Sequence, residues 1–298
     1  MEYIGESAAL GAALTWSFSS FLFTTAVKRI GAMQLNISRL MFATVYLLIT
    51  IAVLGIDYSM SWRQFIYLSI SGVIGLVIGD GFLFMAFKEV GPRISMLLMA
   101  SNPAMAAIIS YFILAENMSL WGIAGMAITL AGISVVVLER HDDGNGGKIH
   151  HITRLGILYG FLAAAGQAVG LIFAKAAYLE GDINGLAATL VRIGSSFIIF
   201  FPITLLFSRN GNSIMKLFSD RKSLGLVAFG SVIGPYLGVT LSFFAVIYTK
   251  VGIASTLLST SPIIMLPLSR LFYHERQTWK AIVGAIAAVA GVGILFLV

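Results

Sequence analysis

The chain has 298 residues, of which 58% are hydrophobic and 11% are charged, and its mean hydropathy is +0.95. Soluble domains carry about 25% charged residues, so this composition excludes a soluble globular protein and indicates an integral membrane protein. The net charge of +6 then reflects loop orientation, no basic stripe suggests nucleic-acid binding, and the absence of cysteine excludes thiolate metal sites and thiol catalysis.

Ten apolar spans follow one another, each about the 20 residues that a helix needs to cross roughly 30 Å of hydrocarbon. Lipid offers no partner to unpaired backbone groups, so these spans are predicted to be helices. We therefore predict an all-α membrane protein with five helices in residues 1–138, a linker loop at 139–153 and five helices in residues 154–298. The spans are 7–27, 35–54, 66–87, 91–115, 119–138, 155–178, 184–207, 224–247, 252–273 and 277–297.

The two five-helix units have related sequences. Pro103 and Glu116 in the fourth span recur as Pro262 and Glu275 in the ninth, both shifted by 159 positions. Chance agreement of ungapped helical segments at a fixed offset is improbable, so the chain contains one unit twice. Five is odd, so the second unit enters the membrane from the opposite face, and the ten transmembrane helices are predicted to form two inverted five-helix repeats. Other matched pairs are Val73 with Val232, Gly75 with Gly234, Gly79 with Gly238 and Gly132 with Gly291.

Each repeat has a proline near the middle of its fourth helix, preceded by polar residues. A proline there kinks the helix and frees a carbonyl one turn earlier. Such bends at mid-membrane depth are where a carrier of this symmetry holds a polar substrate. The alternative is that the hydroxyls only pack helices together and refill the broken hydrogen bonds. The polar candidates beside Pro103 and Pro262 are Asn102, Ser259, Thr260 and Ser261.

Glu116 and Glu275 lie about 20 Å from their prolines along the helix, near the membrane boundary. Ser119 and Thr278 follow three residues later and are predicted to cap the next helices. We expect both glutamates to have a structural role in the helical hairpin, since an acid beside a helix start complements the helix dipole.

Two units with a proline in the fourth helix, a glutamate at its end and a glycine-rich fifth helix resemble the EamA group of the drug/metabolite transporter superfamily. The resemblance covers essentially the whole chain. It implies ten helices around a central cavity lined by the first, third, fourth, sixth, eighth and ninth helices, and outward movement of small metabolites, often amino acids. The glycines are Gly122, Gly125 and Gly132 in one unit and Gly284, Gly291 and Gly293 in the other.

Asp80 in the third span is the deepest acid. A charge at that depth costs about 2.5 to 3.5 kcal/mol on insertion scales, so the side chain should face a wet cavity, pair with a cation or be protonated. It shares a helix face with Phe84, which suits an amine-bearing substrate or a carried proton. The alternative is an interhelical hydrogen bond at closely packed glycines. Its repeat partner is Val239, so an acid site would be asymmetric.

Further candidates for the cavity wall are Trp16, Gln167 and Tyr236. Arg39 and Arg192 correspond at an offset of 153, and the resemblance places their helices at the periphery, where snorkelling or pairing would explain them. No pair of deep cations is expected to converge on the cavity, which argues against phosphorylated sugars and nucleotide sugars as substrates.

We therefore predict a multi-pass protein of the plasma (inner) membrane that is a secondary transporter rather than an enzyme. It would export a small organic metabolite, such as an amino acid or an amphipathic compound, by alternating access coupled to protons through Asp80. Its partners would be the substrate, the lipid bilayer and protons, with no cofactor and no metal. The alternative is a membrane-embedded enzyme or lipid-handling protein, for which the spans lack a catalytic constellation.

Overall fold

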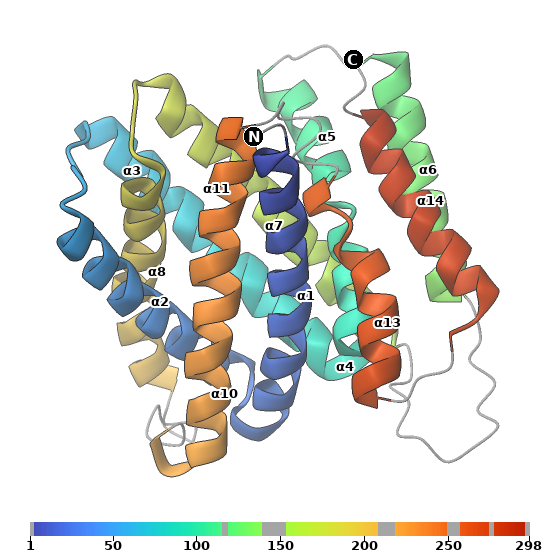
Figure 1. The fold of residues 1–298 in the computed structure, drawn as a ribbon, viewed down its shortest axis with the longest axis horizontal. Coiled ribbons are helices and arrows are strands. Elements are labelled where there is room, and N and C mark those ends of the chain that lie inside the picture. Colours follow the sequence, from blue (N-terminus) through green and yellow to red (C-terminus); the bar gives the residue numbers. More distant parts are fainter. Residues whose placement is uncertain are drawn as a thin grey trace.

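The computed structural model of the protein describes residues 3–114, 119–138, 153–207, 218–248, 257–273 and 277–295. All regular elements in these ranges are helices, and seven helical stretches are long and apolar enough to cross a membrane (Figure 1). The predicted all-α class is confirmed for these residues. Glu116, Glu275 and most of the central linker lie outside them.

The first two helices are joined by a single glycine. α1 (Ile4–Ile30) is followed directly by α2 (Ala32–Leu54), and Gly31 between them has a φ of 87°, which favours glycine. α2 ends at Gly55, whose φ is 61° and whose N–H bonds to the carbonyl of Ile51. The chain therefore reverses direction without a polar loop, which keeps α2 beside α1.

The third span contains a π-helix. α3 (Trp62–Gly72) continues into the π-helix η1 (Val73–Gly79), which leads into α4 (Asp80–Met99). Such π-helical segments are rare and frequently lie at functional sites. We call η1 the π-turn. α4 is kinked at Gly91, with a φ of 75°, directly before Pro92. This kink falls where the sequence places the boundary between the third and fourth spans.

The prolines of the fourth and ninth spans lie at the starts of helices. α5 (Asn102–Leu114) has Pro103 as its second residue, and α13 (Ser261–Tyr273) has Pro262 at the same position. Proline is tolerated in a first turn because its missing N–H would have no intrahelical partner there. The kink expected within one continuous helix is therefore a break between two helices, at residues 100–101 and 259–260.

The second unit repeats the helix boundaries of the first. The offset is 159 at both ends between α3 and α10, between η1 and η3, and between α5 and α13, and it is 153 at both ends between α2 and α8. The repeat in sequence is thus also a repeat in local structure, including the π-turn. The remaining elements are α6 (Leu120–Leu138), α7 (Arg154–Leu179), α8 (Gly185–Phe207), α10 (Arg221–Ser231), η3 (Val232–Gly238), α11 (Val239–Tyr248) and α14 (Trp279–Leu295).

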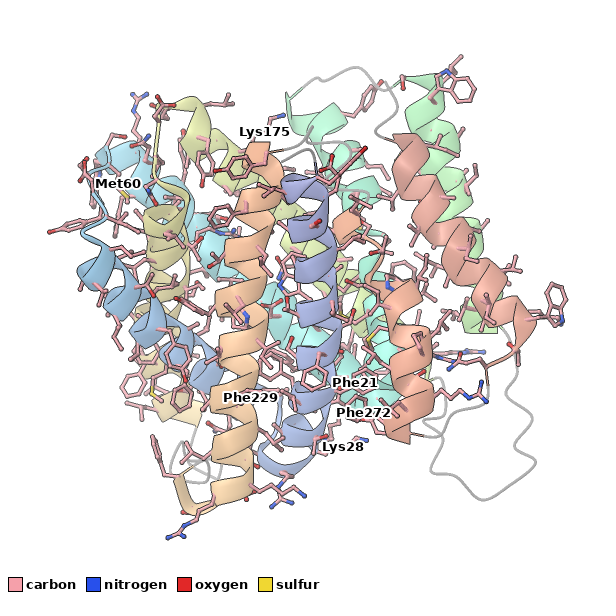
Figure 2. The ribbon with its side chains drawn as sticks, viewed as in Figure 1. Phe21, Lys28, Met60, Lys175, Phe229 and Phe272 are labelled. Carbon is pink, nitrogen blue, oxygen red and sulfur yellow. The ribbon has the colours of Figure 1, made fainter. Side chains whose placement is uncertain are left out.

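The two units pack against each other through equivalent helices. α1 contacts α10, η3 and α11, while α7 contacts α3, η1 and α4. α2 packs on α8, and α6 packs on α14 at one side of the molecule (Figure 1). Lys28, near the end of α1, lies at the opposite end of the molecule from Met60 and Lys175 (Figure 2).

Glycines permit the closest approaches between the units. An added Cβ at Gly132 of α6 would lie 2.5 Å from the backbone nitrogen of Ala288 in α14, and one at Gly166 of α7 would lie 2.8 Å from the Cα of Gly79. Inside a membrane such contact matters because lipid tails are as apolar as the helices, so association depends on close packing and polar bonds. The backbones around Asp80 and α7 are therefore brought together by paired glycines.

Candidate functional site

A buried ion pair lies where α2 meets the start of α4. Asp80 is the first residue of α4, directly after the π-turn, and Arg39 comes from α2. Their side chains are 7% and 8% exposed, respectively, and Arg39 Nη2 donates a hydrogen bond to Asp80 Oδ2. Pairing explains how a carboxylate persists in an apolar span, because it offsets the cost of removing the charge from water.

The other oxygen of Asp80 is bound from the second unit. Gln167 of α7 donates from Nε2 to Asp80 Oδ1. The contact depends on close packing, since an added Cβ at Gly79 would lie 3.1 Å from the backbone nitrogen of Gln167. Asp80 therefore accepts one hydrogen bond from each five-helix unit. The structure thus brings together Asp80 and Gln167, both of which the sequence marks as candidates.

Asn36, which the sequence analysis missed, links α2 to the π-turn. Its Nδ2 donates to the carbonyls of Leu76 and Val77 at 2.9 and 3.2 Å, and its Oδ1 accepts from Arg39 Nε at 3.3 Å. The side chain is fully buried. Its spacing of three residues from Arg39 was an available signal, because residues at that spacing share a helix face.

Phe84 covers the guanidinium of Arg39. The aromatic ring is 2% exposed, and its centroid lies 5.1 Å from the guanidinium carbon, a cation–π arrangement. Phe23 and Phe87 meet the same ring edge-on, at 5.7 and 5.8 Å between centroids. Phe84 thus packs inside the protein as part of an apolar wall around the ion pair.

A second arginine of the apolar spans, half-buried, lies near Asp80. Arg192 of α8 is the repeat counterpart of Arg39, and it interacts electrostatically with Asp80. Its Nε is buried without a hydrogen-bond partner. The pairing expected for Arg39 is confirmed by its ion pair with Asp80, and the expectation that no pair of deep cations converges on a cavity stays a prediction. The resemblance gave both helices a peripheral position, and in the structure α2 and α8 pack on each other beside the π-turn.

The polar residues at the two helix breaks are largely occupied by local bonds. Thr260 and Ser261 each donate to the carbonyl three residues earlier, at 2.6 and 3.3 Å. Ser261 Oγ also lies 3.4 Å from the carbonyl of Ala13, which joins the break to α1. These contacts match the alternative in which hydroxyls refill broken hydrogen bonds. Asn102 and Ser259 are half-buried.

Trp16 and Tyr236 lie in two other interfaces. The indole of Trp16 occupies the space beside Gly238, where an added Cβ would be 2.3 Å from Trp16 Nε1. The hydroxyl of Tyr236 is 2.7 Å from Thr50 Oγ1 of α2. Both residues therefore make helix-packing contacts between the units, and Tyr236 packs on the same apolar cluster as Leu76 and Val77.

Within the described ranges, no group of three His, Cys, Asp or Glu residues is placed to hold a metal ion. The candidate site there is made of guanidinium, carboxylate and amide groups. These groups can exchange a proton or bind a charged solute.

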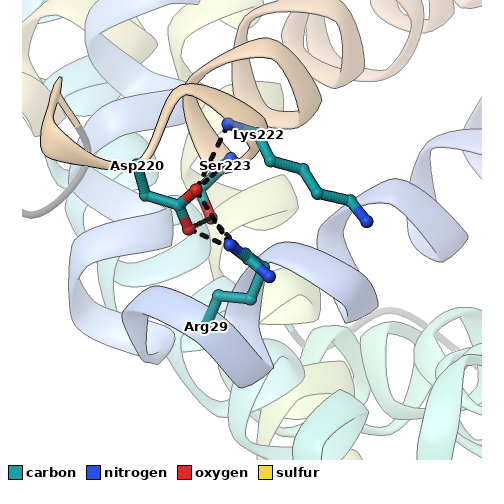
Figure 3. A network of polar contacts seen from close by, with 4 residues as sticks. All are labelled: Arg29, Asp220, Lys222 and Ser223. Carbon is teal, nitrogen blue, oxygen red and sulfur yellow. Dashed lines mark hydrogen bonds and ion pairs between the residues drawn. The ribbon is translucent and has the colours of Figure 1, made fainter.

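Two further ion pairs join the units near the ends of the helices. Asp220 accepts from Arg29 Nε and Nη2 at 2.7 and 2.9 Å and also caps α10 through the backbone N–H groups of Lys222 and Ser223 (Figure 3). The hydrogen bond from Arg29 holds the pKa of Asp220 well below its usual value, with help from the Ser223 hydroxyl.

At the other end, Nη1 of Arg63, the second residue of α3, lies 3.7 Å from Oε1 of Glu180, which directly follows α7. Gln64 strengthens this junction, since its Nε2 donates to the carbonyl of Gly181 at 3.0 Å. In each unit the C-terminal end of the first helix therefore contacts the start of the third span of the other unit: α1 contacts α10, and α7 contacts α3.

Comparison with known proteins gives a consistent result. The model of the EamA-like transporter family matches residues 3–138 and 154–297. An uncharacterized transporter from Archaeoglobus fulgidus is 22% identical over 293 residues, which cover 97% of this chain and 96% of that protein. A crystal structure described only as that of a protein aligns with a TM-score of 0.64 at 19% identity, covering 99% of this chain and 96% of the other. At that identity the structural likeness shows the fold alone.

Proposed function

The chain belongs to the EamA-like transporter family, and we propose that it is a secondary carrier that moves a small organic metabolite by alternating access. With its apolar helices it is an integral, multi-pass membrane transporter. The cargo that we propose is an amino acid or an amphipathic compound, exported across the plasma (inner) membrane.

The proposed movement is a rocking of residues 1–138 against residues 154–298 as two inverted repeats. The odd number of predicted helices in each unit and the repeated helix boundaries support this arrangement. So does the reciprocal packing, in which α1 lies against η3 and α7 lies against η1.

The observation that carries the proposal is the position of Asp80 between the units. Among the residues that the structure describes, Asp80 is the one acid that is buried. It accepts hydrogen bonds from Arg39 of one unit and Gln167 of the other. Protonation would remove its charge and turn one of its oxygens into a donor, which would weaken both contacts. Binding of a proton at Asp80 would then change the relative stability of the two positions of the units.

The test is transport by purified protein in liposomes, with a panel of amino acids, purines and amphipathic cations, with and without a pH gradient. At least one panel member should accumulate under the gradient. Asp80→Asn should abolish gradient-driven uptake while leaving the fold intact, and the exposed loop variant Asp57→Asn should behave as the parent. Full gradient-driven activity in Asp80→Asn would remove the carboxylate from the mechanism, and absence of flux for the whole panel would contradict a carrier.

A further inference from the structure

The buried cluster carries more positive than negative charge. Arg39 and Arg192 both interact with Asp80, and guanidinium groups stay protonated in proteins. Tyr178, the other titratable group that interacts with Arg192, is a phenol and is neutral near pH 7. Two cations and one carboxylate leave one positive charge without a counterion, an expensive arrangement in a membrane protein.

Of the two arginines, Arg192 is the one whose guanidinium N–H groups lack hydrogen-bond acceptors among the described residues. Arg39 uses Nη2 for Asp80 and Nε for Asn36, and Phe84 covers its guanidinium. Within the described ranges Arg192 makes no side-chain hydrogen bond or ion pair, and its Nε is buried and unsatisfied, although the residue as a whole is half-buried. A buried donor without a partner is costly, so a ligand that accepts from this guanidinium would be bound favourably.

Gly75 lies beside this guanidinium in close packing. An added Cβ there would be in ordinary contact with Arg192 Nη2 at 3.7 Å, Gln167 Oε1 at 3.4 Å and Gly170 Cα at 3.7 Å. Gln167 donates from its nitrogen to Asp80, so its oxygen remains on the side of Arg192. A ligand that reaches the half-buried Arg192 from its accessible side would therefore lie near an amide oxygen and the Asp80 ion pair.

We propose that Arg192 binds the carboxylate of a transported monocarboxylate metabolite, next to the π-turn at Gly75. The assignment rests on the proposed carrier function. One surplus positive charge matches one carboxylate, whereas a phosphate dianion would leave the site negative. A guanidinium binds a carboxylate through two parallel hydrogen bonds, so geometry as well as charge favours this partner.

The test is ligand-induced thermal stabilisation of the purified protein, which reports binding without transport. The probes are L-leucine, L-phenylalanine and pyruvate, with L-leucinamide, L-phenylalaninamide and inorganic phosphate as comparisons. At least one carboxylate should raise the unfolding temperature, while its amide and phosphate should not. Arg192→Gln should weaken the binding of that carboxylate at least tenfold, and the exposed control Arg270→Gln should leave it unchanged.

A second readout separates a binding arginine from a structural one. Removing a surplus buried charge should leave the ligand-free protein as stable as the parent or more stable, so Arg192→Gln should raise its unfolding temperature while losing the response to carboxylate. A lower unfolding temperature with an unchanged carboxylate response would overturn the assignment, as would the absence of stabilisation by every carboxylate in the panel.

The outcome is distinguishable from failure of the carrier function. Liposome transport of neutral or cationic compounds without any binding of carboxylates would refute the anion site and leave the carrier intact. Carboxylate binding that depends on Arg192, without flux or exchange in liposomes, would support the site and refute the carrier.

Discussion

Asn36 holds the π-turn and the ion pair in one arrangement, through bonds to the carbonyls of Leu76 and Val77 and to Arg39. Asn36 gives both carbonyls a side-chain donor, and the carbonyl of Val77 also accepts from the backbone N–H of Asp80. The orientation of Arg39 toward Asp80 therefore depends on a residue that touches neither the carboxylate nor Gln167.

Replacement of Asn36 by alanine should destabilise the protein by about 1 to 3 kcal/mol, because it removes a buried amide that bonds to two backbone carbonyls and to Arg39. Thr189, its repeat counterpart on α8, only bonds to a carbonyl four residues earlier at 2.9 Å. Thr189→Ala should therefore cost less, and unfolding of both variants in the same detergent gives the comparison. Equal losses in the two variants would show that the π-turn does not need Asn36.

Part of this site could be predicted from residue type alone. Asp80 and Gln167 stand out because acids and amides are costly in apolar spans, and the structure joins them. Asn36 and Arg192 were not assigned to the site, because hydropathy indicates depth along a helix but not which neighbour the side chain meets. The resemblance placed their helices at the periphery, and the contacts of α8 with α2 and η1 appear only in the structure.

Close packing of helix pairs is a property of whole elements, and α6 with α14 shows it most clearly. An added Cβ at Gly132 would meet backbone atoms of α14 at 2.5 and 2.6 Å, and backbone cannot move aside without separating the helices. An added Cβ at Gly225 of α10 would meet nothing within 4 Å.

Gly132→Ala should accordingly destabilise the protein by about 1 to 3 kcal/mol through overpacking. Gly225→Ala should be neutral or stabilising by up to about 1 kcal/mol, since alanine favours a helix over glycine. Thermal unfolding of the two variants measures both effects. A stability of Gly132→Ala matching that of Gly225→Ala would mean that α6 and α14 separate without cost.

The junction of α1 with α10 should respond to acid. The pKa of Asp220 is lowered by the hydrogen bond from Arg29, so the stabilisation from the ion pair is complete above the ordinary carboxyl pKa of about 3.9. It declines as the pH falls from there toward the lower pKa of the folded state. Asp220→Asn keeps a good helix cap but removes the charge. Its unfolding temperature should be lower than that of the parent at pH 7, and the difference should shrink as the pH falls below about 4. A difference that stays constant with pH would show that the charge is irrelevant.

The sequence predicted the first residues of helices more accurately than the points at which a helix is interrupted. Ser119 and Thr278 cap α6 and α14 as predicted, accepting from backbone N–H groups three residues later at 3.0 and 3.2 Å. A cap is a local pattern that the sequence alone contains. The breaks before Pro103 and Pro262 were expected as kinks, since the loss of one hydrogen bond does not reveal whether packing will hold the two segments in line.

At the scale of the whole molecule, the ion pairs Arg29–Asp220 and Arg63–Glu180 tie the units together, the first at the C-terminal end of α1 and the second at the C-terminal end of α7. Lys28, next to Arg29, and Met60, close to Arg63, lie at opposite ends of the molecule (Figure 2). If the units rock, each end must open in turn.

Cross-linking should therefore arrest the carrier at either end. The chain lacks cysteine, so Arg29→Cys with Asp220→Cys, and Arg63→Cys with Glu180→Cys, give single thiol pairs. A reducible bifunctional thiol reagent should stop liposome transport in each double variant, and reductant should restore it. A pair on one helix, Trp62→Cys with Phe65→Cys, is the control and should transport throughout. Undiminished flux with both end junctions linked would contradict rocking.

The unequal number of arginines and acids around Asp80 also has an electrical consequence. A unit charge that crosses the whole membrane field exchanges about 2.3 kcal/mol per 100 mV. A site that is cationic when empty and neutral when it holds a monocarboxylate without an ammonium group, such as pyruvate, would feel the transmembrane voltage chiefly during its unloaded return. The cell's voltage would then set how fast the protein resets, while leaving the loaded step nearly indifferent to it.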